Sequence, residues 1–323
     1  MDFIDLKTQY KRLKKEIDHG IKSVLEHGQY IMGPEVLELE DSLSEFVSSK
    51  HTISCSSGTD ALLMALMAMD VKPGDHVLTT PFTYIATAEV ISLLGAIPDF
   101  VDIDPKTFNI DINQIEDKLK KYPNKYKFVM PVNIFGLLAD YQAIDQFKDK
   151  YNFKVIEDAA QSFGASYKNK MSCCFGDISC TSFFPAKPLG CYGDGGAIFT
   201  DNDRYAEILK SIRIHGKGDD KYNNVRLGIN GRLDTIQAAV LIPKLKVLRD
   251  EYQGEVHISF GMTTQDEEEE IVIFFEETNQ ANRLVLYSCT SGYPVPFEDI
   301  CMLEIVRIKE RFKHRVKAIG FSG

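Results

Sequence analysis

The sequence predicts an α/β fold in which a mostly parallel central sheet is flanked by helices. Between about residues 51 and 157, short apolar segments alternate with helix-length segments, which is the pattern of α/β folds. Several of the short segments are nearly continuous apolar runs, as expected for strands that are covered on both faces of a sheet. A chain of 323 residues is long enough for one large domain and a smaller second one.

The individual elements follow from apolar periodicity and from helix start signals. An amphipathic helix is expected over 7–27, and a second helix over 34–46 begins with proline, a residue that favours the first helical turn. The strands are expected at 51–57, 76–80, 98–103, 128–132, 154–157 and 197–200. The later helices are expected from about residue 58 and at 84–94, 111–120, 141–150, 203–213 and 235–248.

Composition excludes several classes of protein. The net charge of −10 disfavours a nucleic-acid-binding surface, and no apolar run approaches the ~20 residues that a membrane-spanning helix needs. The N-terminus has neither the basic nor the apolar region of a signal peptide. Seven cysteines without regular spacing indicate a reducing compartment. We therefore expect a cytoplasmic protein without nucleic-acid or membrane partners.

Four of the cysteines are close together in the sequence, namely Cys173, Cys174, Cys180 and Cys191. A metal site is one interpretation, and plain buried thiols are the other. The spacings match no zinc pattern and histidines are absent nearby, so no metal is expected.

Within 181–190, a short apolar run ends in a lone lysine, Lys187, which is surrounded by small, turn-forming residues. A partly desolvated lysine amine has a lowered pKa and can form a Schiff base with an aldehyde. The alternative is a surface lysine on a turn, the usual location of a lysine. The rest of the chain decides between them, because it supplies the other parts of one site.

The segment 56–62 joins a predicted strand to the start of an apolar helix through small polar residues. The free N–H groups and the dipole of a helix N-terminus both attract an anion. The same residues are also good helix caps, so an anion site and a simple N-cap remain equal interpretations.

Ligands of parallel sheets lie at the carboxyl ends of the strands, which makes the polar residues there candidates. Asp158 directly follows a buried strand, where a carboxylate costs free energy unless it is paired. It is either a counter-charge for a protonated ring nitrogen or a helix cap. Tyr84 follows another strand and is either a ring-stacking residue or part of the core or its rim.

A Schiff-base lysine, an anion turn, a ring-stacking aromatic residue and a strand-end aspartate are the parts that a pyridoxal phosphate enzyme supplies. The sequence resembles the DegT/DnrJ/EryC1/StrS aminotransferases, which aminate nucleotide-linked keto-sugars and have the fold type I of pyridoxal-phosphate-dependent transferases. The resemblance covers about residues 1–253 and is carried by motifs in the family's order at 56–62, 81–88, 157–165, 182–187, 193–196 and 228–234.

The resemblance implies a role for each matching residue. Lys187 would bind pyridoxal 5′-phosphate covalently and move the substrate proton, and Asp158 would keep the ring nitrogen protonated. The other implied cofactor contacts are Gly58, Thr59 and Ser182 at the phosphate, Tyr84 on the ring, Gln161 at the phenolic oxygen, and Asn230 at the phosphate of a second subunit's cofactor. The position of Asn230 implies a homodimer with shared active sites.

Within the family, the chain is most similar to the members that aminate UDP-2-acetamido-2-deoxy-3-oxo-glucuronate for O-antigen synthesis. In those members Gly28, Tyr30 and Arg232 match positions that contact the nucleotide-sugar, and L-glutamate is the implied amino donor. One departure lies beside the lysine: many relatives have serine where this chain has Ala186, so one polar contact is expected to be missing.

The resemblance ends near residue 253, and 254–323 does not match the small C-terminal domain of the family. The acidic block 266–270 is expected to be solvent-exposed or disordered, and 271–275 is expected to be a strand. A truncated or aberrant small domain and an altered reading frame remain open as explanations for this atypical segment.

Two functions therefore stay in competition. The first is an active sugar aminotransferase, and the second is a catalytically impaired homologue without a competent C-terminal domain. Dehydratases of the same fold have histidine in place of Lys187, and a Rossmann dehydrogenase would need a glycine-rich motif after the first strand, which is absent.

Overall fold

The computed structural model describes residues 5–220, 222–251, 256–261, 263–277, 279–289 and 303–322. The chain divides into two compact units, 1–246 and 247–323, and each is described by itself. The boundary expected between residues 253 and 254 lies outside the described residues.

The first unit is built on a seven-stranded sheet within the described residues, with strand order β1-β9-β8-β5-β4-β2-β3. Strand β9 is antiparallel to both of its neighbours, and the other neighbouring pairs are parallel, which confirms the predicted α/β class. The strands are β1 (His51–Cys55), β2 (His76–Thr79), β3 (Ile97–Phe100), β4 (Tyr126–Val129), β5 (Lys154–Asp158), β8 (Ile178–Ser182) and β9 (Gly196–Thr200). A small hairpin pairs β6 (Ser166–Tyr167) with β7 (Lys170–Met171).

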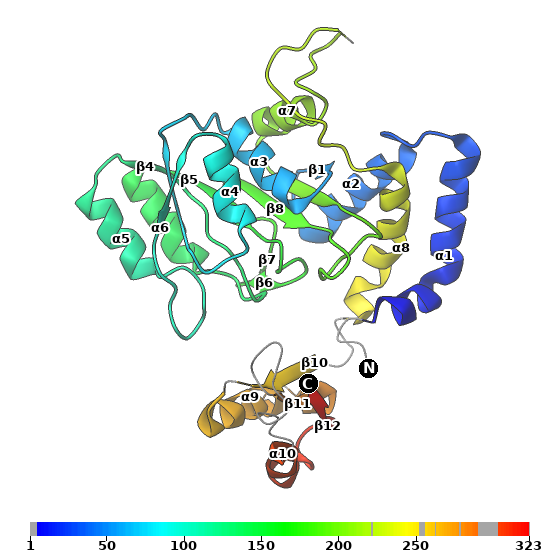
Figure 1. The fold of residues 1–323 in the computed structure, drawn as a ribbon, viewed down its shortest axis with the longest axis vertical. Helices are drawn as coiled ribbons and strands as arrows, with labels where there is room; N and C mark the ends of the chain where they lie inside the picture. The colour runs from blue at the N-terminus through cyan, green and yellow to red at the C-terminus, as the bar shows by residue number, and fades with distance from the viewer. Residues whose placement is uncertain are drawn as a thin grey trace. The chain divides into compact units, whose positions relative to one another are not determined.

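The helices of this unit lie close to their predicted positions. They are α1 (Leu6–His27), α2 (Pro34–Val47), α3 (Gly58–Ala68), α4 (Ala86–Leu93), α5 (Ile112–Lys121), α6 (Tyr141–Tyr151), α7 (Asp203–Ile212) and α8 (Thr235–Glu251). Helix α4 begins at Ala86, so Tyr84 lies in the preceding loop rather than in the helix as predicted. Helices α1 and α8 lie side by side, and a Cβ on Gly20 would lie 3.2 Å from the carbonyl oxygen of Ala239 (Figure 1).

Successive strand residues point to opposite faces of the sheet, and helices cover both faces. Val77 and Ile156 belong to a core shared with α3, α4 and α7. Their sequence neighbours Leu78 and Val155 belong to a second core shared with α5 and α6. This arrangement explains the continuous apolar runs of the strands and leaves the ends of the sheet for polar function.

The second unit contains a parallel sheet of order β10-β11-β12 in its described residues. Its elements are β10 (Val256–Phe260), α9 (Gln265–Glu277), a 3₁₀ turn (Ala281–Arg283), β11 (Leu284–Cys289), α10 (Glu304–Phe312) and β12 (Ala318–Ser322). Its core is formed by Phe260, Val272, Phe275, Leu284, Leu286, Ile308 and Phe312.

The strand expected at 271–275 was wrong, whereas the acidic block 266–270 fits the solvent-exposed alternative at Asp266, Glu267 and Glu270 but not at the buried Glu268. Residues 271–275 are helical, and the acidic block 266–270 is ordered in the same helix, α9. The Nη2 atom of Arg307 lies 2.7 and 2.9 Å from the two carboxylate oxygens of Glu268, and Arg311 donates to Glu269 at 3.1 Å. The two arginines lie 39 and 42 residues after their glutamate partners in the sequence. The charges near the acidic block in the sequence therefore gave no sign that its negative charge is neutralised. No helix in the described ranges is long and apolar enough to cross a bilayer.

Candidate active site

Four of the predicted site residues, Gly58, Asp158, Ser182 and Lys187, lie at or just after the carboxyl ends of three strands of the seven-stranded sheet. Cys55 at the end of β1 and Ser182 at the end of β8 both pair with Gly196, the first residue of β9. Asp158 at the end of β5 pairs with Cys180 of β8. The carboxyl ends of β1, β5 and β8 therefore come together, as the topology predicts: β5 ends at Asp158, Gly58 follows β1 and Lys187 follows β8.

The start of α3 forms a compact turn against β8. Ser57 is the N-cap, and its hydroxyl accepts a hydrogen bond from the Asp60 N–H at 3.0 Å. A Cβ on Gly58 would lie 2.7 Å from the Cβ of Ser182, so only glycine allows this approach. Because the first N–H groups of a helix have no partner inside it, Gly58 and Thr59 can present theirs to an anion beside the Ser182 hydroxyl. The N-cap and anion-site interpretations are thus compatible.

Asp158 is buried, with 5% of its surface exposed. Its Oδ2 accepts a hydrogen bond from the Thr87 hydroxyl at 2.9 Å, and its Oδ1 accepts one from the Ala160 N–H at 3.2 Å. Burial raises the pKa of Asp158, while these two donors and the charge of Lys187 oppose the rise. A buried carboxylate with donors on both oxygens is held in one orientation, as a counter-charge for a cationic ring would need.

Lys187 lies on a tight turn after β8, and its backbone N–H donates to the Phe184 carbonyl at 2.9 Å. The turn is closed at Gly190, where a Cβ would lie 2.3 Å from the carbonyl oxygen of Pro185. Burial lowers the pKa of Lys187, and the charge of Asp158 opposes this shift. Lys187 is therefore half-buried and feels the charge of the Asp158 carboxylate, which favours the reactive-amine interpretation over an ordinary surface lysine.

Two other predicted cofactor contacts are solvent-exposed at this edge. Tyr84 has 72% of its surface exposed on the loop after β2. Gln161 is exposed in the turn after β5. Their proposed contacts with a cofactor ring remain predictions.

The predicted substrate residues lie on two segments joined by a backbone bond. The Thr235 N–H donates to the Tyr30 carbonyl at 3.0 Å, which connects the segment carrying Tyr30 to the one carrying Arg232. Arg232 is half-buried, and its Nε is a buried donor without a hydrogen-bond partner in the described structure. A hollow of about 310 Å³ beside Tyr30 is lined by Tyr30, Ile31, Asp234, Ile236 and Gln237. Gly28 is exposed in a left-handed conformation at the end of α1.

Asn230 is exposed, and its backbone forms an isolated bridge with Ile214. The segment between α7 and α8 extends away from the sheet in Figure 1. The neighbours of Asn230 hold its backbone against the end of β1 and the end of α7, because the Ser56 N–H donates to the Gly231 carbonyl at 3.1 Å and the Ile229 N–H donates to the Ile212 carbonyl at 2.9 Å. The contact of Asn230 with a second copy remains a prediction.

Sequence reasoning missed several residues at the same edge. Phe82, Phe108 and Phe135 follow β2, β3 and β4, and their ring centroids lie between 5.6 and 6.0 Å apart. Thr87, the partner of Asp158, was also missed. The signal that could have found the phenylalanines is their position just after strands, where ligand-binding loops occur.

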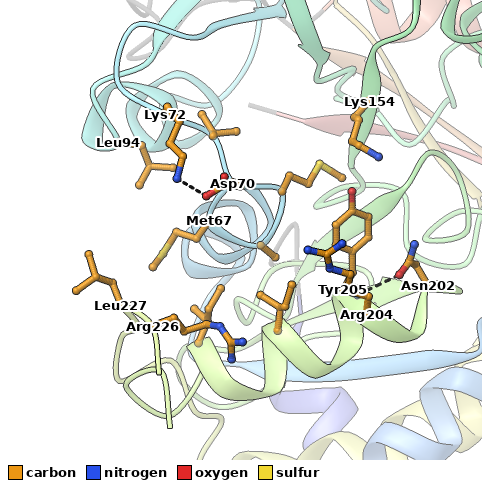
Figure 2. Close-up of a pocket in the computed structure, with 15 residues that line it drawn as sticks. Met67, Asp70, Lys72, Leu94, Lys154, Asn202, Arg204, Tyr205, Arg226 and Leu227 are labelled. Carbon is orange, nitrogen blue, oxygen red and sulfur yellow. Dashed lines mark hydrogen bonds and ion pairs between the residues drawn. The ribbon is translucent and has the colours of Figure 1, made fainter. Parts of the chain in front are cut away.

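The hollow in Figure 2 has a volume of about 840 Å³ and lies elsewhere. Its lining includes Lys154 at the amino end of β5, Asp70 and Lys72 after α3, and Tyr205 of α7. Since Lys154 and Asp158 are opposite ends of one strand, this hollow is at the edge of the sheet away from Lys187.

Three of the clustered cysteines, Cys173, Cys180 and Cys191, are buried, and Cys174 is half-buried. Burial raises the pKa of Cys173 and Cys180 well above the usual range and raises that of Cys191 to about 11. Such thiols are largely protonated and unreactive at neutral pH. Among the described residues, no group of three or more potential ligands lies close enough to hold a metal ion.

An α/β fold with a half-buried lysine and a buried strand-end aspartate at the carboxyl ends of its strands is typical of the class of pyridoxal-phosphate-dependent enzymes. The family model of the DegT/DnrJ/EryC1/StrS aminotransferase family matches residues 11–287. The chain belongs to this aminotransferase family, which confirms the resemblance seen in the sequence.

Two curated relatives illustrate the similarity. The chain is 55% identical over 251 residues to the UDP-2-acetamido-2-deoxy-3-oxo-D-glucuronate aminotransferase of Pseudomonas aeruginosa, covering 78% of this chain and 69% of the relative. It is 39% identical over 238 residues to the UDP-N-acetyl-3-dehydro-alpha-D-glucosamine 3-aminotransferase of Acidithiobacillus ferrooxidans, covering 74% and 63%. The chain thus spans slightly less than two thirds of the second relative's length.

Solved structures agree with this assignment. An aminotransferase of the same family from Brucella abortus superimposes with a TM-score of 0.76 at 44% identity, covering 86% of this chain and 72% of that one. A Bacillus subtilis structure with the cofactor PMP bound has a TM-score of 0.68 at 35% identity, covering 72% and 53%. The cofactor of the family, pyridoxal phosphate, is therefore the one predicted from the sequence, and the glycine-lined turn and the buried aspartate of this chain fit it.

Proposed function

We propose that the protein transfers an amino group from L-glutamate to a nucleotide-linked keto-sugar, with UDP-2-acetamido-2-deoxy-3-oxo-glucuronate as the substrate and O-antigen sugar synthesis as the context. The observation that carries the proposal is the half-buried Lys187, whose pKa burial lowers, within the electrostatic influence of the buried Asp158 at the carboxyl ends of the strands. The similarity to the Pseudomonas aeruginosa enzyme supports the choice of sugar.

The bound cofactor supplies a conjugated ring that stabilises negative charge on the substrate carbon. Asp158 lies at a buried strand end, and its carboxylate would favour the protonated form of the ring nitrogen of a bound cofactor. Lys187 is the proton carrier, because a lowered pKa leaves a larger neutral fraction of its Nζ near pH 7. The neutral Nζ of Lys187 would accept the proton that leaves the substrate carbon and would later release it.

The phosphate is bound by the start of α3 and the end of β8. The backbone N–H groups of Gly58 and Thr59 and the hydroxyl of Ser182 are the donors. We also propose that Asn230 of a second copy completes this site, so that the active form is a homodimer.

The nucleotide-sugar is bound by Gly28, Tyr30 and Arg232. Arg232 suits a diphosphate or a sugar carboxylate, because its planar fork donates two parallel hydrogen bonds. Its buried Nε has no hydrogen-bond partner among the described residues, which leaves a donor for such a ligand. Ala186 offers no hydroxyl where many relatives have serine, so cofactor binding relies on the remaining contacts.

The test is an assay of the purified full chain with pyridoxal phosphate, L-glutamate and the UDP-linked 3-keto-glucuronate generated in situ by oxidation. We expect 2-oxoglutarate and a UDP-linked 3-amino sugar acid in equal amounts. Lys187→Ala should abolish both products, whereas Lys106→Ala, an exposed turn lysine, should not. Folded protein that binds the cofactor but forms neither product would instead support the catalytically impaired homologue.

A further inference from the structure

Thr87 connects the first turn of α4 to the end of β5. It is buried, with 1% of its surface exposed, and its Oγ1 lies 2.9 Å from the Asp158 Oδ2. A second hydroxyl follows, since the Thr83 Oγ1 lies 2.8 Å from the Thr87 Oγ1. Thr83 is next to Tyr84 in the loop after β2, so the chain of hydroxyls connects the loop of the proposed ring-stacking residue to Asp158.

The direction of these hydrogen bonds follows from proton counting. An ionised carboxylate only accepts hydrogen bonds, so Thr87 must donate its single hydroxyl proton to Asp158. The lone pairs of the Thr87 oxygen are then available, and Thr83 is the donor of the second bond. The two hydroxyls form a relay that ends on one oxygen of the carboxylate.

We propose that Thr87 is a positioning residue for Asp158, and that Thr83 orients the Thr87 hydroxyl. The inference rests on the proposed function, in which Asp158 faces the ring nitrogen of the cofactor. With Thr87 on Oδ2 and the Ala160 N–H on Oδ1, the carboxylate is fixed about its terminal torsion before the cofactor arrives. A site that is oriented in advance binds its ligand without an ordering cost.

The replacement that isolates this role is Thr87→Val, which keeps the shape of the side chain and removes the hydroxyl. The buried Oδ2 then loses its donor, and the carboxylate either turns or takes up a proton. A hydrogen bond to a charged group contributes about 1.5–3 kcal/mol, which corresponds to roughly 10- to 100-fold weaker cofactor binding. Thr87→Ser keeps the donor and should restore binding, and Thr83→Val should give a smaller loss.

The experiment is an absorption titration of the full chain with pyridoxal phosphate, together with the thermal midpoint of the cofactor-free protein. Thr200→Val is the matched control, because Thr200 is also buried and donates to the Asp177 carbonyl at 2.8 Å, at the far end of β9. We expect Thr87→Val to raise the dissociation constant at least tenfold and Thr200→Val to leave it unchanged. In an Asp158→Asn background, Thr87→Val should have little further effect, because the relay acts through the carboxylate.

Equal dissociation constants for wild type and Thr87→Val would overturn the inference and leave the proposed function intact. The inference would also be overturned if Thr87→Ser weakened cofactor binding as much as Thr87→Val does, because the hydroxyl would then not be responsible for the loss. Wild-type protein that is folded but binds no pyridoxal phosphate would overturn the proposed function and the inference with it. If Thr87→Val does not fold, Thr83→Val alone decides: an unchanged dissociation constant overturns the relay.

Discussion

Glu157 and Asp158 are neighbours on β5, yet their carboxylates lie in separate hydrogen-bond networks. Asp158 bonds to Thr87 and to the Ala160 N–H, on the side of the proposed cofactor. Glu157 is fully buried and accepts five hydrogen bonds. The donors are Asn133 at 3.0 Å, Ser172 at 3.1 Å, Ser179 at 2.7 Å, and the N–H groups of Cys173 at 3.3 Å and Phe175 at 3.0 Å. One carboxylate belongs to the proposed site, and the other ties the end of β5 to the segment 172–179.

Replacing Glu157 by glutamine should therefore destabilise the first unit. An amide NH₂ would face donors that now converge on a carboxylate oxygen, and the charge that strengthens the other bonds would be lost. We expect a loss of about 2–4 kcal/mol in the free energy of unfolding. Urea unfolding measures it, and Glu38→Gln, an exposed change on α2, is the control. Equal midpoints for the two variants would contradict this role for Glu157.

Gly58→Ala should weaken cofactor binding by a steric clash, although it removes no polar group. The new Cβ would lie 2.7 Å from the Cβ of Ser182, and both atoms are attached directly to backbone that the sheet and α3 hold. The turn must open, which moves the N–H donors away from the phosphate. We expect the dissociation constant of pyridoxal phosphate to rise at least tenfold, a change of about 1.4 kcal/mol. Unchanged binding of both the cofactor and inorganic phosphate would show that this turn is not the phosphate site.

The reactivity of Lys187 should persist to lower pH than that of the other lysines. Burial lowers the pKa of Lys187. At any pH below the pKa of ordinary lysines, a larger fraction of the Lys187 amine is therefore neutral and nucleophilic. Labelling of the cofactor-free protein with an amine-reactive reagent across pH 6–10, read by peptide mass spectrometry, measures this. Its labelling curve should lie to the acid side of the curve for exposed Lys106, and Asp158→Asn should move it further, because the carboxylate now raises the pKa. Coincident curves would contradict the assignment.

Much of the first unit could be predicted from local patterns. The strands are apolar on both faces, so their positions and the edge that gathers Gly58, Asp158 and Ser182 follow from periodicity and from the parallel-sheet rule. The partner of Asp158 could not be predicted in this way, because Thr87 lies 71 residues earlier and its hydroxyl resembles any polar residue in a helix. The same limit applies to Glu157, whose burial depends on the later segment 172–179.

The second unit shows the limit more strongly. The sequence of α9 combines an acidic block with an apolar run, which locally favours disorder followed by a strand. Pairing with Arg307 and Arg311 of the following segment reverses the balance, since it removes the repulsion among the glutamates. The apolar residues Val272 and Phe275 then contact the sheet as a helical stripe.

This pairing gives a test of the second unit in the full chain. The Glu268 side chain is buried, and both of its carboxylate oxygens accept a hydrogen bond from the Arg307 Nη2. Glu268→Gln should therefore loosen the packing of α9 and α10 on β11. We expect amide hydrogen exchange in β11 to become roughly tenfold faster, in line with about 1.5 kcal/mol for a charged hydrogen bond. Exposed Glu270→Gln is the control.

If the β11 amides of the wild type exchange at the rate of an unfolded chain, this unit is not a folded module, and the altered-reading-frame explanation gains support. The coding DNA gives an independent check, because stop codons or unrelated residues in the shifted frame would exclude that explanation.

The most direct test of the central claim is to locate the covalent attachment of pyridoxal phosphate. The purified chain is incubated with the cofactor, reduced with sodium borohydride to make the lysine linkage permanent, and mapped by peptide mass spectrometry. We predict a single modified residue, Lys187, and loss of the label when L-glutamate is added before the reduction. Modification spread over exposed lysines, or absent from Lys187 in folded protein, would contradict the assignment of this chain as an active aminotransferase.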